Sequence, residues 1–515
     1  MIPNQQRSPS PGDPQGDFMS QDESDAIWLQ NVKPSTTKSP TPKKRYHLVV
    51  IGAGPAGLVA AAGAAGLGAN VALIETNKMG GDCLNYGCVP SKSLLHAAKK
   101  TRAFSNEATP ANLRPNESDF KASFRRLKDI RAHLSQHDSV ERFKDLGVDV
   151  FLGHGRFSGP NTIRVNEHTL NFKRALIATG ARATPLSVPG SEQVPVHTNE
   201  TIFDLKQRPD RLVIIGGGAI GCEMAQAFTG LGTEVTQLEK SSRLLGREDP
   251  DASELLTKQL RSEGTKVLLG TNVISLRMSD DEKLVTIANS TGETNLPTDE
   301  ILVCVGRTAN VSQLDLEAAN IRCDAKGGIA VNDYLQTTNH RIYAAGDVTG
   351  LEQFTHAADF MARIVIQNAL FMGRRRYSSL IIPRCTYTTP EIAHVGINAA
   401  QALDNPNRYS TLTIPFTEVD RALIEREQDG FARIHLRKGT DQILGATIVH
   451  PHAGEMVSTI CLAMTQGIGL KKIAETIFPY PTQSDALRKI GDRYNRSRLT
   501  PMIQAMFKKW FQLNS

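Results

Sequence analysis

The segment from Gly80 to Lys92 contains two cysteines, Cys83 and Cys88, with four residues between them. Val-Pro-Ser-Lys follows Cys88, and a proline near the first helical position favours a helix start there. A thiol at a helix N-terminus lies at the positive end of the helix dipole, and Lys92 adds a positive charge one turn further on. The segment predicts a redox-active disulfide whose thiolate is stabilised at Cys88.

A chance spacing, or half of a structural zinc site, would also account for this cysteine pair. Structural zinc needs a second pair of ligands, and no second cysteine pair occurs in the sequence. The remaining cysteines are scattered, which does not fit an extracellular disulfide framework. We expect them to be small apolar or incidental residues: Cys222, Cys304, Cys323, Cys385 and Cys461.

A strand–loop–helix–strand pattern comes directly before the cysteine segment. The apolar run from Tyr46 to Ile51 predicts a buried parallel strand, followed by Gly52, Gly54 and Gly57 in a GxGxxG loop and a second strand ending at Glu75. Such glycines let a phosphate approach a helix N-terminus, and the terminal acid accepts a ribose hydroxyl. The pattern predicts a dinucleotide site.

The same pattern recurs over residues 211–239, with Gly216, Gly218 and Gly221 in the loop and Glu239 at the end of the second strand. The repetition fits two occupied sites, or one occupied site and a decayed copy. Because the second copy keeps its glycines and its acid, we favour two occupied sites. Two dinucleotides beside a disulfide indicate electron flow from a nicotinamide through a flavin to sulfur.

Composition narrows the class of protein. The chain has 515 residues, is 40% hydrophobic and contains 41 glycines, which is typical of a soluble α/β protein of several domains. Its net charge of +6 is spread along the sequence, so nucleic-acid binding is not expected. We find neither a run of about 18 apolar residues nor a secretory signal, and expect a cytoplasmic protein.

From residue 44 to about residue 498 the chain resembles the class I pyridine nucleotide-disulfide oxidoreductases, and it is most similar to their mercuric reductase branch, with likeness also to lipoamide dehydrogenase and glutathione reductase. The resemblance implies a homodimeric enzyme that binds FAD and NADPH or NADH, without a resident metal ion. Gly346 and Asp347 match the second FAD motif. The cofactor-binding residues implied are Gly52, Gly54, Gly57, Glu75, Gly80, Lys92, Thr179, Gly180, Gly346, Asp347, Gly216, Gly218, Gly221, Glu239 and Gly306.

The fold implied is α/β, with two Rossmann-like three-layer ββα dinucleotide-binding domains and a C-terminal α+β dimerisation domain. The expected boundaries are a disordered tail (1–43), the first part of the FAD-binding domain (44–190), the NAD(P)H-binding domain (191–310), a second FAD-binding or central part (311–378), the dimerisation domain (379–498) and a basic amphipathic tail (499–515). Residues 118–146 are expected to form an amphipathic surface helix.

The resemblance also implies roles for individual residues. Cys88 would be the thiolate facing the flavin, Cys83 the thiol that meets the acceptor, and Glu223 the partner of Lys92. In disulfide reductases of the family, a histidine and a downstream glutamate of the partner subunit protonate the leaving thiol.

This chain departs from the family pattern at the histidine and the glutamate. Tyr480 and Asp485 stand at those two positions. A tyrosine with an ordinary pKa of ~10 is a poor base at neutral pH, whereas a histidine at ~6.5 is well matched. Tyr480 could instead be an aromatic residue packed at an interface. His450 and His452 are close to Tyr480 in sequence and are alternative candidates for the missing acid–base group.

The tyrosine at this position resembles the pattern of the mercuric reductases. A soft metal ion needs thiolates and a nearby polar oxygen rather than a proton relay. The leading hypothesis is therefore an acceptor such as Hg(II), although the chain ends without the vicinal cysteines of those enzymes. The alternatives are a reductase or dehydrogenase of a small disulfide or dithiol, and a membrane-docked flavoprotein that uses the basic C-terminal helix. Glu239 favours NADH, whereas Lys240, Arg243 and the family likeness favour NADPH.

Overall fold

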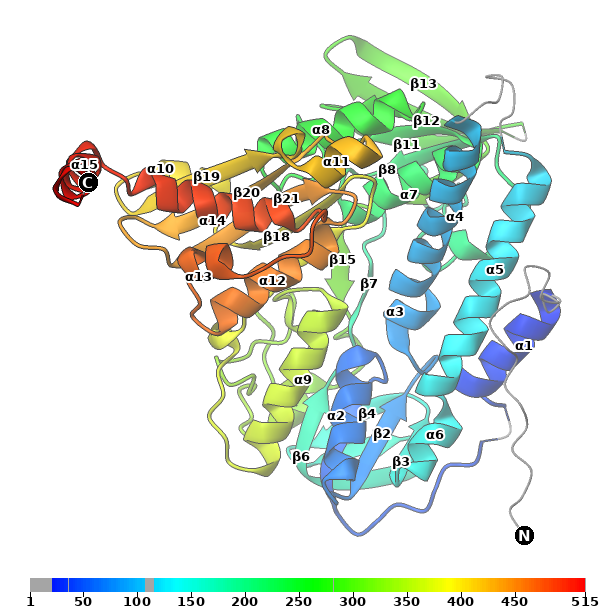
Figure 1. The fold of residues 1–515 in the computed structure, drawn as a ribbon. Coiled ribbons are helices and arrows are strands. Elements are labelled where there is room, and N and C mark those ends of the chain that lie inside the picture. The colour runs from blue at the N-terminus through cyan, green and yellow to red at the C-terminus, as the bar shows by residue number, and fades with distance from the viewer. Residues whose placement is uncertain (1–20, 36, 107–114, 281, 515) are drawn as a thin grey trace, which may run out of the picture.

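The computed structural model describes residues 21–35, 37–106, 115–280 and 282–514. The fold consists of two α/β units and a C-terminal α+β unit. Two long helices, α4 (Cys88–Asn106) and α5 (Glu117–Ser135), run side by side, with α5 at the outer edge of the molecule (Figure 1). The predicted fold class is confirmed. Within the described part of the chain, no helix has both the length and the apolar character needed to span a bilayer.

The first unit is a mixed sheet in which β3, β2, β1, β6, β5 and β4 lie in that order and β16 pairs with β6. β1 runs parallel to both β2 and β6, the arrangement expected when a helix connects successive strands. Its elements are β1 (Tyr46–Ile51), α2 (Pro55–Gly66), β2 (Val71–Glu75), β3 (Val148–Leu152), β4 (Gly155–Gly159), β5 (Thr162–Val165), β6 (His168–Ile177), β16 (Ile342–Ala344) and α9 (Thr355–Leu370).

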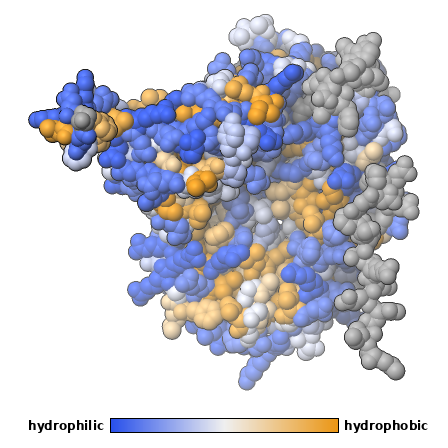
Figure 2. Space-filling view, in the orientation of Figure 1, coloured by the Kyte–Doolittle hydropathy of each residue, from blue (hydrophilic) through white to orange (hydrophobic). Residues whose placement is uncertain are grey.

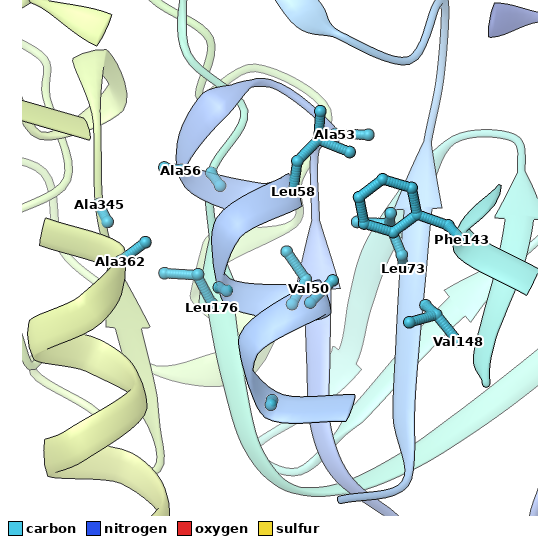
Figure 3. Packing of buried hydrophobic residues seen from close by; sticks show 14 of the residues in the cluster. Val50, Ala53, Ala56, Leu58, Leu73, Phe143, Val148, Leu176, Ala345 and Ala362 are labelled. Carbon is cyan, nitrogen blue, oxygen red and sulfur yellow. The ribbon is translucent and has the colours of Figure 1, made fainter. Parts of the chain in front are cut away.

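The core of this unit lies between the sheet and its helices. Val50, Leu73 and Leu176 point from three neighbouring strands toward α2, and Ala362 faces them from α9 (Figure 3). All four are fully buried. Because β1 is apolar on both faces, it takes the central place in the sheet and fixes the loop at its C-terminal end.

The second unit repeats this plan with a parallel sheet in the order β10, β9, β8, β14 and a separate three-stranded antiparallel sheet, β11–β13. A short strand pair, β7 with β15, connects it to the first unit. Its elements are β7 (Ala181–Ala183), β8 (Arg211–Ile215), α7 (Ala219–Gly230), β9 (Glu234–Leu238), α8 (Pro250–Ser262), β10 (Lys266–Leu268), β11 (Asn272–Ser279), β12 (Glu282–Asn289), β13 (Gly292–Thr298), β14 (Glu300–Val303) and β15 (Arg307–Ala309).

The C-terminal unit is an antiparallel sheet in the order β17, β18, β21, β20, β19, with helices packed against it. Its elements are β17 (Arg384–Thr386), β18 (Glu391–Gly396), α10 (Ala399–Asp404), β19 (Tyr409–Pro415), α11 (Asp420–Glu425), β20 (Phe431–Arg437), β21 (Ile443–His450), α12 (Ala453–Thr465), α13 (Leu470–Glu475), α14 (Asp485–Ser497) and α15 (Pro501–Leu513). α15 projects away from the rest of the chain and buries none of its residues (Figure 1).

The prediction of a disordered tail over residues 1–43 is wrong for part of its length, and residues 1–20 lie outside the described residues. Residues Gln21–Val32 form a helix, α1, that packs against α5. Trp28 and Val32 are buried in the core of the first unit. The polar and proline-rich sequence around Trp28 and Val32 does not indicate that they are buried, and an ion pair between Asp25 and Lys128 also joins α1 to α5.

The predicted helix over residues 118–146 is also divided. It becomes α5 and a second helix, α6 (Val140–Asp145), because Ser139 adopts an extended conformation and caps α6 by accepting a hydrogen bond from the Arg142 N–H. α5 itself begins with a capping box at Asn116 and Asp119.

Candidate active site

The two cysteines lie on consecutive helices. Cys83 is on α3 (Gly81–Asn85), and Cys88 is the first residue of α4. The Cys88 Sγ lies 3.6 Å from the Oγ1 of Thr355, which is the first residue of α9. Cys88 is therefore at the N-termini of two helices, where the helix dipoles favour a negative charge.

The electrostatic surroundings separate the two thiols. The hydrogen bond from Cys83 lowers the pKa of Cys88 to about 6, with the Lys92 charge and the Thr355 hydroxyl acting in the same direction against desolvation. The pKa of Cys83 is raised, first by the same hydrogen bond and then by burial. In the reduced pair the negative charge belongs to Cys88, because its thiolate accepts the Cys83 proton donor.

Lys92 connects the cysteine helix to the second unit. Its Nζ lies 2.6 Å from the Oε2 of Glu223 on α7, a carboxylate that is almost fully buried. The other oxygen of Glu223 accepts a 2.9 Å hydrogen bond from the Tyr387 N–H, and the Lys92 ammonium lies over the Tyr387 ring. The predicted Lys92–Glu223 contact is thus present, and Tyr387 is a third member that sequence spacing did not indicate.

The first glycine loop has the shape of a phosphate cradle. Gly52 has φ +100°, and a Cβ there would lie 2.3 Å from the Ala178 oxygen; a Cβ on Gly57 would lie 1.8 Å from the Gly52 oxygen. Gly54 caps α2 without a side-chain hydrogen bond, which leaves the helix N–H groups for an anion. Glu75 accepts 2.7 Å hydrogen bonds from the N–H groups of Ala53 and Asn77. These groups fit the ADP half of FAD.

The second loop repeats that geometry. A Cβ on Gly216 would lie 2.3 Å from the Cys304 oxygen and one on Gly221 2.2 Å from the Gly216 oxygen, whereas Gly218 faces open space. Glu239 accepts a 2.7 Å hydrogen bond from the Gly217 N–H, as Glu75 does from Ala53. These groups fit a second dinucleotide.

The cysteine segment packs directly on the first loop. Gly80 has φ +89° and its N–H donates to the Ala53 oxygen at 2.9 Å. A Cβ on Gly81 would lie 2.5 Å from the Gly54 Cα, so only paired glycines allow this approach. The contact fixes the cysteine segment against the loop that would hold the dinucleotide.

Arg307 joins the cysteine helix to the predicted second FAD motif. Its Nη2 lies 3.0 Å from the Asp82 Oδ2, and its Nε lies 3.5 Å from the Asp347 Oδ2. Asp347 follows Gly346, which has φ +78°, and burial raises the pKa of its carboxyl.

Three further predicted cofactor residues lie near the β7–β15 connection. Gly180 has φ +68°, and Gly306, with φ +133°, precedes β15. Thr179 donates a 2.7 Å hydrogen bond to the Asn310 oxygen.

The N-terminal helix α1 reaches the cysteine segment. The Trp28 Nε1–H donates a 2.7 Å hydrogen bond to the Oδ1 of Asn85, which lies between the two cysteines in sequence. The Asn85 amide in turn donates to the oxygens of Met79 and Gly81, and the Arg131 guanidinium stacks on the Trp28 ring at 3.7 Å. Sequence spacing gave no signal for this contact, because 57 residues separate its partners.

Tyr480 makes no contact of this kind with the cysteines of its own chain among the described residues. Its side chain is 74% exposed on the C-terminal unit. Its hydroxyl donates a 3.0 Å hydrogen bond to the Asp420 Oδ2, which raises the pKa of Tyr480. Asp485 is buried at the start of α14, where Arg488 binds its Oδ1 at 2.7 Å. Asp420, and not Asp485, therefore holds the Tyr480 hydroxyl.

Comparison with known proteins gives a consistent result along the chain. The family model described as pyridine nucleotide-disulphide oxidoreductase matches residues 46–362. The model of that family's dimerisation domain matches residues 382–490.

Among individual relatives, the chain is 34% identical over 444 residues to a mercuric reductase of Bacillus cereus, covering 86% of this chain and 70% of that protein. It is 33% identical over 448 residues to a dihydrolipoyl dehydrogenase of Chlamydia muridarum, covering 85% and 95%. Of solved structures, the HOCl-induced flavoprotein disulfide reductase RclA of Escherichia coli superposes with a TM-score of 0.78 at 28% identity, covering 87% and 99%. A Cu(II) complex of RclA gives a TM-score of 0.77 at 29% identity, covering 86% and 98%.

Proposed function

The chain belongs to the pyridine nucleotide-disulphide oxidoreductase family, whose members bind FAD and use NAD(P)H, and we propose that its Cys83–Cys88 pair reduces a metal ion such as Hg(II). When bound, FAD supplies the two-electron relay between the nicotinamide and the disulfide. The names of two relatives support this acceptor class, since one is a mercuric reductase and another was solved as a Cu(II) complex.

The proposed step at the thiols balances in atoms and electrons. The Cys88 thiolate and the Cys83 thiol bind Hg(II) and close their S–S bond, which releases two electrons to give Hg(0). The Cys83 proton leaves to solvent. The overall reaction converts NAD(P)H and Hg(II) to NAD(P)+, H+ and Hg(0).

The observation that favours a metal ion over a disulfide as the acceptor is the hydrogen bond of Tyr480. A hydroxyl that already donates to Asp420, with a raised pKa, is unsuited to exchange protons with a thiol at neutral pH. Its oxygen still offers a polar contact to a metal ion. We propose a homodimer in which Tyr480 of the partner subunit approaches Cys83.

The test of this role is a pair of substitutions. Tyr480→Phe should lower metal-dependent NAD(P)H oxidation, whereas Tyr480→His should raise turnover of lipoamide or glutathione disulfide. Tyr409→Phe, on β19, is the matched control and should change neither activity. Unchanged metal turnover in Tyr480→Phe would remove Tyr480 from the site.

A second candidate function, reduction of a small disulfide, is favoured by a cavity beside Cys88. It has a volume of about 490 Å³ between α4 and α5, and its lining includes the apolar Val89, Ile130 and Leu134 and the basic Lys92 and Arg126. A lining that combines apolar side chains with the cations of Lys92 and Arg126 suits an acceptor that has an apolar body and an anionic end.

Paired aromatic disulfides with and without carboxylates would test this candidate. Arg126→Gln should selectively raise KM for the anionic member, whereas Arg125→Gln, one residue away on the same helix, should not. Equal effects of the two substitutions would exclude a specific contact.

The nucleotide donor we propose is NADPH. Lys240 and Arg243 follow Glu239, and the Lys240 side chain is exposed beside the second glycine loop. The Arg243 guanidinium already binds the Gly246 oxygen at 2.8 Å, which leaves Lys240 as the freer cation. Lys240→Gln should therefore raise KM for NADPH more than KM for NADH.

We also propose that α15 makes a weak contact with an anionic membrane surface. The helix exposes Met502, Met506, Phe507, Trp510 and Phe511 beside Lys508 and Lys509, so apolar and basic groups occur together on its surface (Figure 2). The full-length protein should sediment with anionic liposomes, and a chain that ends at Leu499 should not. Equal sedimentation of both chains would contradict this contact.

A further inference from the structure

A group of potential metal ligands lies on the C-terminal unit, outside the cysteine site. Ligand atoms of Glu425, Glu427 and His452 all lie within 4.8 Å of one another. Glu425 ends α11, Glu427 lies in the loop that leads to β20, and His452 precedes α12. We propose that these three side chains bind a divalent transition-metal cation of borderline softness, such as Zn(II) or Cu(II).

The donor set fits this class of cation. One imidazole and two carboxylates suit Zn(II) and Cu(II), whereas a soft ion such as Hg(II) prefers thiolates. Zinc–ligand bonds of ~2.0–2.2 Å place neighbouring ligand atoms roughly 3–3.5 Å apart, so binding requires the ligand atoms to approach one another by at most about 2 Å. Glu425 and His452 are exposed and can do so by changing rotamer.

An independent observation comes from His450, which is fully buried behind the group and packs on the Phe416 ring. Its Nδ1 accepts a 3.3 Å hydrogen bond from the His452 N–H, so in the neutral ring the proton is on Nε2. That Nε2 lies 4.0 Å from the Oε2 of Glu427, and both atoms are buried without a hydrogen-bond partner.

Buried polar atoms without a hydrogen-bond partner are rare in folded proteins, and a small shift of Glu427 that brings its Oε2 within reach of the His450 Nε2–H would satisfy both. If Glu427 turns to ligate a cation through one oxygen, its other oxygen can accept the His450 proton. This is the arrangement by which a second group orients a metal-binding carboxylate.

The surrounding charges permit a cation. Arg421 binds the Oε1 of Glu425 at 2.5 Å, and the amide of Gln483 donates to its Oε2 at 2.8 Å. Each carboxylate oxygen has a further lone pair, so these contacts leave Glu425 able to bind a metal. Glu427 contributes a second negative charge.

Two hydrogen bonds connect the segment that contains Tyr480 to α11, the helix that ends at Glu425. Tyr480 binds Asp420 at the start of α11, and Gln483, three residues after Tyr480, binds Glu425 at its end. A helix of six residues is about 9 Å long, so the proposed cation would lie near the Tyr480 side chain. The proposal does not depend on which acceptor the thiols reduce.

The test is a Zn(II) titration of the oxidised holoenzyme by calorimetry, since a closed disulfide removes the thiolates of Cys83 and Cys88 as competing ligands. One equivalent per chain is expected, and Glu427→Gln and His452→Ala should each weaken binding by at least about tenfold. Glu455→Gln and His340→Ala are the controls, and each should keep the affinity of the wild type.

Co(II) provides a spectroscopic check that does not depend on affinity. The bound ion should show visible d–d bands without a sulfur-to-cobalt charge-transfer band, and His452→Ala should remove them. The proposal is overturned if no equivalent binds, if Glu427→Gln and His452→Ala bind as the wild type does, or if the control variants lose as much affinity.

Discussion

At the scale of single residues, the arrangement assigns opposite protonation states to two thiols of the same type. Cys88 has the lower pKa because it accepts a hydrogen bond from Cys83 and lies near Lys92, whereas Cys83 is a donor. Sequence spacing predicted which cysteine begins the helix. It could not predict Thr355, which comes from a helix 267 residues away.

The first prediction concerns the identity of the thiolate. Two-electron reduction of the holoenzyme without oxygen should produce a long-wavelength absorbance from the Cys88 thiolate beside the flavin, and this band should titrate with a pKa of about 6. Cys88→Ser should abolish the band, and Cys83→Ser should show it before any reductant is added. Absence of the band in Cys83→Ser at neutral pH would reverse the two roles.

The second prediction concerns Lys92. Lys92→Gln should raise the pKa of the Cys88 thiol by about 1 unit or more, because a nearby positive charge is removed while the charge of Glu223 remains. The thiolate would then be lost at a higher pH as the solution is acidified, which a spectroscopic titration measures.

Two matched variants make the Lys92 experiment specific. Lys100→Gln, on the exposed part of the same helix, should leave the titration unchanged. Adding Glu223→Gln to Lys92→Gln should bring the pKa part of the way back, since Glu223 acts to raise it. A titration in Lys92→Gln that matches the wild type would exclude the charge effect.

At the scale of elements, the cysteine segment is held from both sides. Gly81 packs on Gly54 of the first loop, and Trp28 of α1 binds Asn85 between the two cysteines. The second contact comes from a helix that lies before residue 46, where the family match begins. α1 is therefore part of the support of the site and not a separate tail.

The third prediction concerns the contact between Trp28 of α1 and the cysteine segment. Trp28→Phe should lower the free energy of unfolding by about 1–3 kcal/mol, because the Asn85 oxygen loses its buried donor. Hydrogen exchange over residues 80–88 should become faster. Urea unfolding and exchange measured by mass spectrometry would test both effects.

Leu29→Ala is the control for Trp28→Phe, since Leu29 is the next residue on α1 and is exposed. Its effect should stay within about 0.5 kcal/mol. Equal exchange over residues 80–88 in Trp28→Phe and the wild type would mean that α1 does not brace the cysteines.

The elements also show how far sequence reasoning extends. Both glycine loops were predictable, because their strand, turn and helix signals are local: Gly52 and Gly216 stand where the chain needs positive φ. The α1 helix was missed, since its stability comes from tertiary packing of Trp28 and not from its own polar sequence. Asp420 was missed because it meets Tyr480 only in the folded chain.

At the scale of the whole molecule, the C-terminal unit leaves several large apolar side chains exposed. Large apolar side chains of α11, α12 and the segment before Tyr480 face solvent: Leu423, Ile424, Leu462 and Ile477. Exposed apolar side chains gain stability when association with a second subunit removes them from water. The match to a dimerisation domain over residues 382–490 agrees with such an association.

The fourth prediction is a symmetric homodimer with two shared active sites. Light scattering at assay concentrations should give twice the mass of the 56.2 kDa chain. Ile424→Asp should weaken the dimer and the acceptor activity together, whereas Leu403→Asp, on exposed α10, should change neither. A fully active monomer would contradict the shared site.

We propose that the two thiols deliver electrons to a metal ion, and stopped-flow reoxidation of the reduced enzyme tests this proposal. The holoenzyme is reduced by two electrons without oxygen and mixed with Hg(II) as its cysteine complex, Cu(II), lipoamide or glutathione disulfide. Cys83→Ser corrects for oxidation that bypasses the thiols. We expect a metal ion to reoxidise the wild type at least about a hundredfold faster than either disulfide, which is the lower end of the contribution of general acid–base catalysis. Reoxidation by a disulfide at a rate equal to or above that of both metal ions would contradict it and leave disulfide reduction as the function of this site.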